Sequence, residues 1–345
     1  MELYFLDENF AVTDIVDGFS SIVWSEKFHD VGTFTLHFPR EYVPRVRDAA
    51  YVRTPYSDDG SAKCGRIECL SVGSDGDCKM SGHTLEVLLS DRVISGRGVY
   101  SGTVTDAVLS AVRNNLRGCG VTVADDQPLI SDEVSLAYGY DRLSTWLYST
   151  LKPYGASFRV TLGPDNTPLF TLVIGADRSS GSASGEQAAV FSSSFGNIVS
   201  FEYEKNTTET KNTAYVEGDD GTVVTVDRSG GAKIREVHHK ADDIVRDDFA
   251  TEEEYEAALC KRGLEVLAKQ ADGMRVSAEC DFDALPRYGE DYFLGDVCDV
   301  CDGTVGLSFA LRLTQADTVW ERGRMTVFPS FGDEIRSVKA VTDSL

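Results

Sequence analysis

Cys298 and Cys301, in the sequence Cys-Asp-Val-Cys, have the spacing of a zinc or redox motif. A structural zinc site needs four ligands, and the sequence has no second cysteine pair at this spacing. If residues 297–301 form a β-strand, the two thiols point to opposite faces of the sheet and cannot bind one metal ion. We therefore predict two ordinary strand cysteines, no metal site, and eight cysteines that remain thiols in a reducing compartment.

Histidine, which could serve as a general base, occurs five times, at positions 29, 37, 83, 238 and 239. Neither a G-x-S-x-G elbow nor an H-E-x-x-H sequence is present, so nothing places a nucleophile or a metal beside any histidine. The phosphate-binding glycine patterns of nucleotide-binding proteins are also missing. We predict no catalytic residues and no cofactor-binding residues.

Paired carboxylates could hydrolyse a glycan, but with 56 Asp and Glu residues some pair always has a suggestive spacing. Asp296, Asp299 and Asp302 repeat every three residues, whereas a calcium-binding EF-hand loop needs acids at its positions 1, 3 and 5. The 3 Trp, 14 Tyr and 17 Phe could form a sugar-stacking platform or, more often, a core or a subunit interface. A cell-wall hydrolase and a host-carbohydrate-binding module therefore remain alternatives.

The composition describes a folded, strongly acidic protein of 345 residues, with 33 Lys and Arg, a net charge of −23 and 42% hydrophobic residues. This length suggests two or three domains. Such a charge repels phosphate backbones and anionic lipids, so sequence-independent nucleic-acid or membrane-surface binding is not expected. The sequence predicts no membrane-spanning segment, and its acidic amino-terminal residues are unlike a signal peptide. Synthesis in the cytoplasm is expected.

The elements that would position these residues are mostly strands. Residues 33–38 alternate apolar and polar side chains, with Phe34, Leu36 and Phe38 on one face, and residues 22–24 precede them as the other half of a hairpin. Further strands are predicted at residues 65–70, 158–162, 169–174, 221–226 and 325–328. The pattern indicates a β-rich α+β protein.

Helices are the exceptions. Apolar spacing predicts one helix from Thr103 or Thr105 to Leu116 and another over residues 141–154, with a short turn at 84–89. The clearest covers residues 251–270 and begins with a Thr251-x-x-Glu254 capping box. Small polar residues at 177–187 predict a flexible loop.

In their order along the chain, several segments resemble the siphophage tail-tip, or baseplate hub, proteins related to the amino-terminal module of tail-associated lysins. The segments are residues 22–24 (Ile-Val-Trp) with 32–36 (Gly-Thr-Phe-Thr-Leu) and Pro39, 65–67, 80–89 with Arg92, 191–198 (Phe-Ser-Ser-Ser-Phe-Gly-Asn-Ile), 211–216, 262–265, 288–297 and 328–332. Together they cover about residues 15 to 335.

The resemblance implies tandem β-barrel-like hub domains with a small α/β insertion and one long helix. The expected domains are 1–97, a barrel-like domain that strands from 195–240 can complete; 98–180, an α+β insertion; 188–250 with 275–335, a second barrel-like domain; and 251–272, an amphipathic helix.

The resemblance also implies a structural virion component of the tail tip that acts without enzymatic activity. Three copies would form a hub ring that closes the distal end of the tail tube and contacts the distal tail protein and the tape-measure protein. DNA would pass through the ring without specific binding. Part of the negative charge could then line the channel, or it could serve the solubility of the unassembled monomer.

Overall fold

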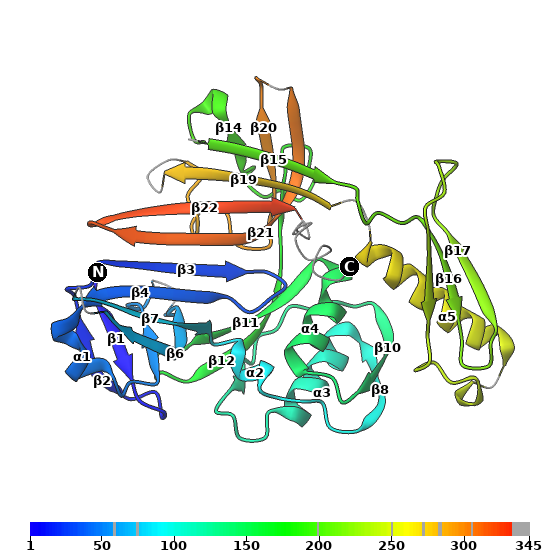
Figure 1. The fold of residues 1–345 in the computed structure, drawn as a ribbon, viewed down its shortest axis with the longest axis horizontal. Helices are drawn as coiled ribbons and strands as arrows, with labels where there is room; N and C mark the ends of the chain where they lie inside the picture. The colour runs from blue at the N-terminus through cyan, green and yellow to red at the C-terminus, as the bar shows by residue number, and fades with distance from the viewer. Residues whose placement is uncertain are drawn as a thin grey trace. The chain divides into compact units, whose positions relative to one another are not determined.

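The computed structural model describes residues 1–57, 60–73, 76–198, 200–249, 251–270, 273–281, 285–304 and 306–332 (Figure 1). The chain forms two compact units. Unit 1 combines Met1–Glu202 with Val276–Phe331, and unit 2 contains Tyr203–Arg275.

Unit 1 is organised around a large sheet whose strands come from both ends of the chain, and two of these strands, at 200–206 and 273–281, cross the boundaries of the unit. The strands are β1 (Leu3–Leu6), β2 (Val12–Val16), β3 (Ser21–Lys27), β4 (Thr33–Pro39), β5 (Tyr51–Arg53), β6 (Cys64–Val72), β7 (Asp77–Thr84), β13 (Asp177–Arg178), β14 (Val190–Ser192), β15 (Ser200–Asn206), β19 (Gly273–Asp281), β20 (Val297–Asp302), β21 (Leu307–Glu321) and β22 (Arg324–Gly332). Their order is β15-β19-β22-β21-β3-β4-β7-β6-β5-β1-β2, and β20 joins β21 to β13 and β14.

The alternation in residues 33–38 produces β4 as predicted. Phe34, Leu36 and Phe38 are buried, while the residues between them are partly exposed. β4 pairs antiparallel with β3, so that Trp24 lies opposite Phe34 and Ile22 opposite Leu36. These side chains form one core with residues of β1, β5 and β7.

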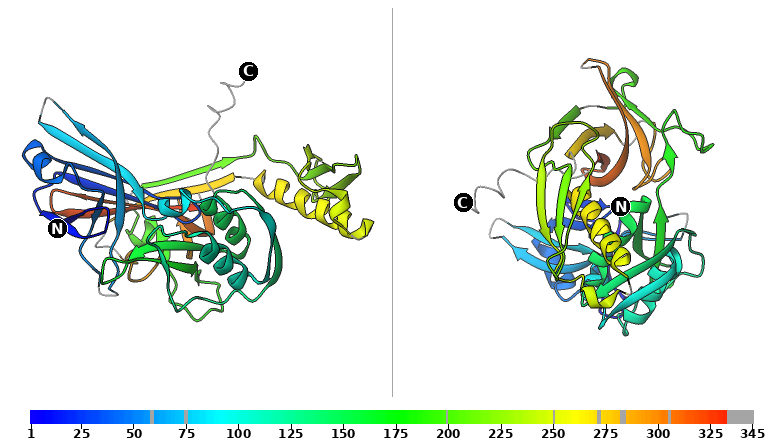
Figure 2. Two further views of the ribbon diagram at one scale, coloured as in Figure 1. Left: turned by 90° about the horizontal axis from the view of Figure 1, so that it is seen from below. Right: turned by 90° about the vertical axis from the view of Figure 1, so that its right-hand side faces the viewer.

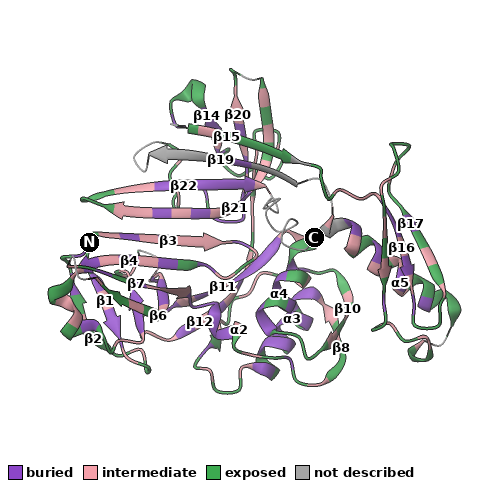
Figure 3. Ribbon diagram, viewed as in Figure 1, coloured by how far each residue is buried: buried purple, intermediate pink, exposed green. Residues whose placement is uncertain are grey.

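A helical layer with two small sheets completes unit 1. It contains the short helix α2 (Val87–Ser90), which packs on α4, and the elements β8 (Arg97–Thr103), α3 (Val104–Asn115), β9 (Thr122–Val123), β10 (Glu133–Gly139), α4 (Leu143–Leu151), β11 (Ala156–Leu162) and β12 (Pro168–Ile174). Another short helix, α1 (Val43–Val46), lies elsewhere in the unit. Thr103 caps α3 by accepting a 3.1 Å hydrogen bond from the Asp106 amide. Residues 97–174 lie together in both views of Figure 2, and the buried side chains of α3, α4, β11 and β12 form one core (Figure 3).

Unit 2 consists of one helix on a three-stranded sheet. The sheet orders β17 (Val223–Asp227), β16 (Thr213–Glu217) and β18 (Glu236–Lys240), and α5 (Glu252–Lys269) packs on it. α5 begins with the predicted capping box between Thr251 and Glu254. Tyr255 and Leu259 of α5 are buried in the core of this unit.

The β-rich α+β class is confirmed, with 44% of residues in strands and 18% in helices. In the described residues the large sheet is an open path from β15 to β2, and no closed barrel is found there. The predicted loop at 177–187 begins instead with a short strand, because Asp177 and Arg178 pair with Val297 and Cys298 of β20. The predicted domain boundaries remain a prediction.

Candidate interaction site

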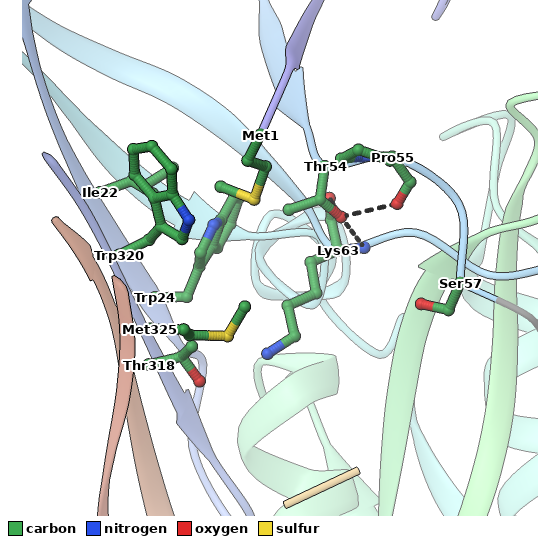
Figure 4. Close-up of a pocket in the computed structure, with 10 residues that line it drawn as sticks. All are labelled: Met1, Ile22, Trp24, Thr54, Pro55, Ser57, Lys63, Thr318, Trp320 and Met325. Carbon is green, nitrogen blue, oxygen red and sulfur yellow. Dashed lines mark hydrogen bonds between the residues drawn. The ribbon is translucent and has the colours of Figure 1, made fainter. Parts of the chain in front are cut away.

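A pocket of about 220 Å³ lies in unit 1 between the large sheet and the segment that follows β5 (Figure 4). The strands β3, β21 and β22 provide one wall, and residues 54–57 with Lys63 provide the opposite wall. The lining residues are Met1, Ile22, Trp24, Thr54, Pro55, Ser57, Lys63, Thr318, Trp320 and Met325.

Strand register brings the aromatic wall together. Alternation places Ile22, Trp24 and Glu26 on one face of β3. On β21, Thr318 lies opposite Trp24 and Trp320 lies opposite Ile22. The hairpin from β21 to β22 then places Met325 opposite Trp320. Two indoles and a thioether therefore share one side of the sheet.

Two polar groups in this wall are buried without a hydrogen-bond partner. They are the Trp24 Nε1–H and the Thr318 hydroxyl, on side chains of residues that are 2% and 8% exposed. A buried donor without a partner costs about 1–3 kcal/mol. Both atoms are also closed off from solvent, so they lie behind the surface of the wall.

On the opposite wall, an ion pair fixes the position of Lys63. Its Nζ lies 2.6 Å from Glu26 Oε2, and the Tyr288 hydroxyl donates to the same oxygen at 3.2 Å. Burial acts to raise the pKa of Glu26, but Lys63 and Arg159 outweigh burial, so the pKa is lowered. The same environment raises the pKa of Tyr288 well above its usual value, chiefly through burial. Glu26 is therefore an anion that holds Lys63 in place.

This ion pair continues into a buried network between the sheet and the helical layer. Arg159 of β11 lies 3.7 Å from Glu86, whose carboxylate also accepts a 3.3 Å hydrogen bond from the Val160 amide. Burial acts to lower the pKa of Arg159, but Glu26 and Glu86 outweigh burial, so the pKa is raised. The network thereby joins β3, β11 and the segment before α2.

The pocket is suited to binding an apolar group. Its walls offer two indoles, two methionines and a lysine ammonium, and Trp and Met are common anchors in protein interfaces. Among the residues that the structure describes, the lining has neither a histidine nor a carboxylate side chain.

The predicted strand parity of Cys298 and Cys301 is observed. β20 points Cys298 into the core of unit 1, while Cys301 is only partly buried and lies 3.2 Å from the Ser308 hydroxyl. Burial raises the pKa of the Cys298 thiol, which keeps it protonated. The seven cysteines that the structure describes carry free thiols, and Cys280 lies outside the described side chains.

The histidines lie apart from one another, except for the neighbours His238 and His239. His37, His83 and His238 each contact a carboxylate, of Asp77, Glu68 and Glu217, at 2.9, 2.6 and 3.0 Å respectively. His29 Nε2 lies 3.1 Å from the Ala156 carbonyl oxygen, and His239 Nε2 is buried without a partner in the described part of unit 2.

The three aspartates near β20 each accept hydrogen bonds from local groups. Asp296, which is 3% exposed, accepts from the Ala176 amide at 2.8 Å and from Arg178 Nε at 2.7 Å. Asp299 accepts from the Ser180 amide and Asp302 from the Thr304 amide. In the described residues, no group of three or more His, Cys, Asp or Glu side chains could hold a metal ion.

Sequence reasoning did not find the pocket. Trp24 falls in a predicted hairpin strand and in the family pattern, and Met325 falls in a predicted strand, whereas no sequence pattern marks Lys63, Thr318 or Trp320. The sequence signal for the pocket would be a tryptophan on each of two strands. These strands, β3 and β21, pair although about 290 residues separate them along the chain.

None of the described helices is long and apolar enough to span a membrane.

Comparison with known families gives a match over nearly the whole chain. A family model described as "Siphovirus ReqiPepy6 Gp37-like protein" matches residues 1–333. No curated protein sequence matches the chain significantly.

Solved structures with the same fold include a tail protein from Neisseria meningitidis MC58, with a TM-score of 0.57, 14% identity and coverage of 93% of this chain and 94% of that chain. A 43 kDa tail protein of prophage MuSo2 from Shewanella oneidensis has a TM-score of 0.57 and 12% identity, and covers 96% and 98% respectively. The prophage tail protein gp18 from Listeria monocytogenes EGD-e has a TM-score of 0.54 and 12% identity, and covers 99% and 98%. At these identities the likeness shows the fold.

Proposed function

Since the chain belongs to the siphovirus ReqiPepy6 Gp37-like protein family, we propose that it is a structural hub of a phage or prophage tail tip. In this proposal three copies form a ring that closes the distal end of the tail tube and lets DNA pass on ejection. The observation that carries it is the match of nearly the whole chain, in both sequence family and fold, to phage tail proteins.

The charge of the chain supports a role in DNA passage. A ring that DNA crosses must not retain it, and negative side chains around the bore would repel phosphates. With a net charge of −23, the chain can place acids on its lumen and keep its outer surface soluble. The remaining partners would be the distal tail protein and the tape-measure protein, and the virion tail tip would be the site of action.

A structural role without catalysis fits the groups that the structure describes. The pocket presents anchors for a protein partner, and the histidines are paired with carboxylates or lie apart from the pocket. We therefore propose that any lytic activity of the tail belongs to another domain or protein.

Oligomeric state and shape test the proposal directly. Light scattering coupled to gel filtration should give three times the mass of the 37.7 kDa chain, and negative-stain images should show a ring with a central bore. A monomer at all accessible concentrations, also in the presence of the neighbouring tail proteins, would contradict the hub. Clearing of purified cell walls would instead favour the hydrolase alternative, and glycan binding would favour a carbohydrate-binding module.

A further inference from the structure

Five arginines gather at one end of the helical layer of unit 1. Three segments, residues 91–97, 113–117 and 139–143, form what we call the arginine surface. Their charged residues are Asp91, Arg92, Arg97, Arg113, Arg117, Asp141 and Arg142. This surface therefore has a net charge of +3, whereas the whole chain has a net charge of −23. Arg92 is half-buried, and the other four arginines are exposed.

Hydrogen bonds bring the three segments together. The Leu143 amide donates to the Arg92 carbonyl oxygen at 2.8 Å, and Val93 lies opposite Arg142 in an antiparallel bridge. Arg117 reaches the same place from the end of α3, because its Nη2 donates to the Val93 carbonyl oxygen at 2.7 Å. The guanidinium groups are thus positioned by the fold of this layer.

The remaining two arginines extend the surface on both sides. Arg97 lies opposite Gly139 at the end of the β8–β10 pair, and a Cβ placed on Gly139 would lie 3.6 Å from Arg97 Cγ. The side chain of Arg97 therefore lies across this glycine. Arg113 stands in the last turn of α3, four residues before Arg117. Both strands lie on the outer side of α3 and α4 (Figure 1).

These positive charges are not neutralised locally. Within the described residues, none of the five guanidinium groups forms an ion pair with a carboxylate. Asp91 pairs with Arg66, and Asp141 Oδ2 accepts a 2.9 Å hydrogen bond from the Gly139 amide. Several unpaired cations close together produce a local positive potential, which attracts a negatively charged partner.

Apolar side chains among the arginines favour a protein as that partner. Val93 is 44% exposed and Tyr140 is 65% exposed. Tyr140 has a left-handed backbone with a φ of 58°, which is uncommon for so large a side chain. Arg and Tyr are enriched where proteins bind one another. A nucleic acid is disfavoured, because the acidic remainder of the chain repels phosphates.

A matching negative surface occurs in unit 2. Residues 242–249 and 251–256, which we call the acidic segment, contain eight acids and a single base, Arg246. Asp242 pairs with Lys240 and Asp243 with Arg262. Five other acids are exposed and have no ion pair in the part of the chain that the structure covers. They are Asp247, Asp248, Glu252, Glu253 and Glu256.

We propose that the arginine surface of one copy binds the acidic segment of a second copy, and this inference rests on the proposed hub ring. The two surfaces carry equal numbers of unpaired charges of opposite sign. Such complementary surfaces speed association and fix how the partners are aligned. Because the surfaces belong to different parts of one chain, the contact is head-to-tail and repeats until the rotation closes.

Charge reversal in the full chain tests each surface. Arg97→Glu combined with Arg142→Glu should raise by about tenfold or more the concentration at which half of the protein is assembled, measured by light scattering. Glu252→Arg combined with Glu253→Arg should have the same effect. Assembly of the unchanged protein should also weaken from about 0.1 M to about 1 M salt, because the screening length falls from about 10 Å to about 3 Å.

A control pair separates the arginine surface from the net charge. Arg228→Glu combined with Lys233→Glu changes the charge of the chain by the same amount, at exposed positions outside both surfaces. This protein should assemble like the unchanged one, and circular dichroism should confirm the fold of every variant. An equal loss of assembly in the control pair would overturn the inference.

Mixing the two reversed proteins tests whether the contact joins different copies. Neither should assemble alone, but the mixture should, because each reversed surface then meets a surface of opposite charge on the other protein. A contact within one chain gives no association on mixing, and that result would overturn the inference.

The outcomes also separate the inference from the proposed function. A ring that persists in both reversed proteins overturns this contact and leaves the hub intact. Rescue on mixing, with the unchanged protein forming an open filament, supports the contact and contradicts the closed ring. A chain that stays monomeric under all conditions, also with the neighbouring tail proteins, overturns both.

Discussion

At the scale of single residues, we expect the stability of unit 1 to depend strongly on the ion pair between Glu26 and Lys63. Glu26→Ala leaves Lys63 and Arg159 without their shared anion, and breaking a buried pair from one side costs about 3–5 kcal/mol. We expect a loss of this order in the free energy of unfolding of unit 1, measured by urea titration. Glu321→Ala, at an exposed pair with Arg322 of 3.6 Å, is the control and should change stability by less than about 0.5 kcal/mol.

The pH dependence gives this prediction a second readout. The pKa of Glu26 in the folded protein lies below its ordinary value of 4.5, so its contribution to stability is present above that pH. The contribution is lost as the pH falls through the folded pKa, because the protonated carboxyl no longer holds the two cations. Glu26→Ala should therefore show a shallower loss of stability below about pH 4.5 than the unchanged protein. Equal slopes in the two proteins would contradict this account.

The sequence predicts some single residues well, for a local reason. Strand parity alone separates Cys298 from Cys301, because it needs only the alternation of one strand. The hydrogen bond from Asn197 Nδ2 to the Leu285 carbonyl oxygen could not be predicted, because 88 residues separate the two along the chain. The family pattern at 191–198 marked this stretch without showing which side chain is buried and which is exposed.

At the scale of elements, helix propensity and packing favour different residues at position 263 in the middle of α5: propensity favours alanine, and packing favours the glycine that is present. Ala normally stabilises a helix over Gly by about 1 kcal/mol. Here a Cβ would lie 2.5 Å from Val226 Cγ2 and 3.1 Å from Val216 Cγ2, and overpacking costs about 1–3 kcal/mol. Gly263→Ala should therefore lower the stability of unit 2 by about 1 kcal/mol, measured by thermal unfolding.

A double substitution isolates the packing contribution in α5. Val226→Ala removes the clashing methyl groups, so Gly263→Ala should be less destabilising in that background than alone. If Gly263→Ala stabilises the unchanged protein, the helix is not packed as closely on β17 as the structure indicates.

Elements with strong local patterns were predictable, and their partners were not. The capping box of α5 and the alternation of β4 are both observed, since each is encoded within a few residues. The antiparallel pairing of β3 with β4 follows from a short connection. On its other edge β3 pairs with β21, and no periodicity in either strand specifies the other. The pocket depends on that second pairing, so it could not be found from the sequence.

At the scale of the whole molecule, the two units should unfold separately. Each has its own buried core, that of unit 2 containing Leu259 and that of the large sheet containing Leu36. Calorimetry should show two transitions. Leu259→Ala should lower the melting temperature of one transition, and Leu36→Ala that of the other. Each substitution should reduce the free energy of unfolding of its own unit by about 2–5 kcal/mol, as is usual for a buried leucine.

Each of these two variants is the control for the other, because each should leave the transition of the other unit unchanged. If both substitutions shift a single common transition, the units fold as one cooperative block. Measurements below the concentration of assembly keep association from adding stability to either unit.

The order of strands in the large sheet has a consequence for synthesis. β3 is made early but lies beside β21, which leaves the ribosome about 290 residues later. At about 5–20 residues per second this delay is about 15–60 s. During that time the edge of β3 lacks its partner and the pocket wall has no Thr318, Trp320 or Met325. A nascent chain therefore lacks a complete pocket and a fully paired β3 until its last strands have been synthesised.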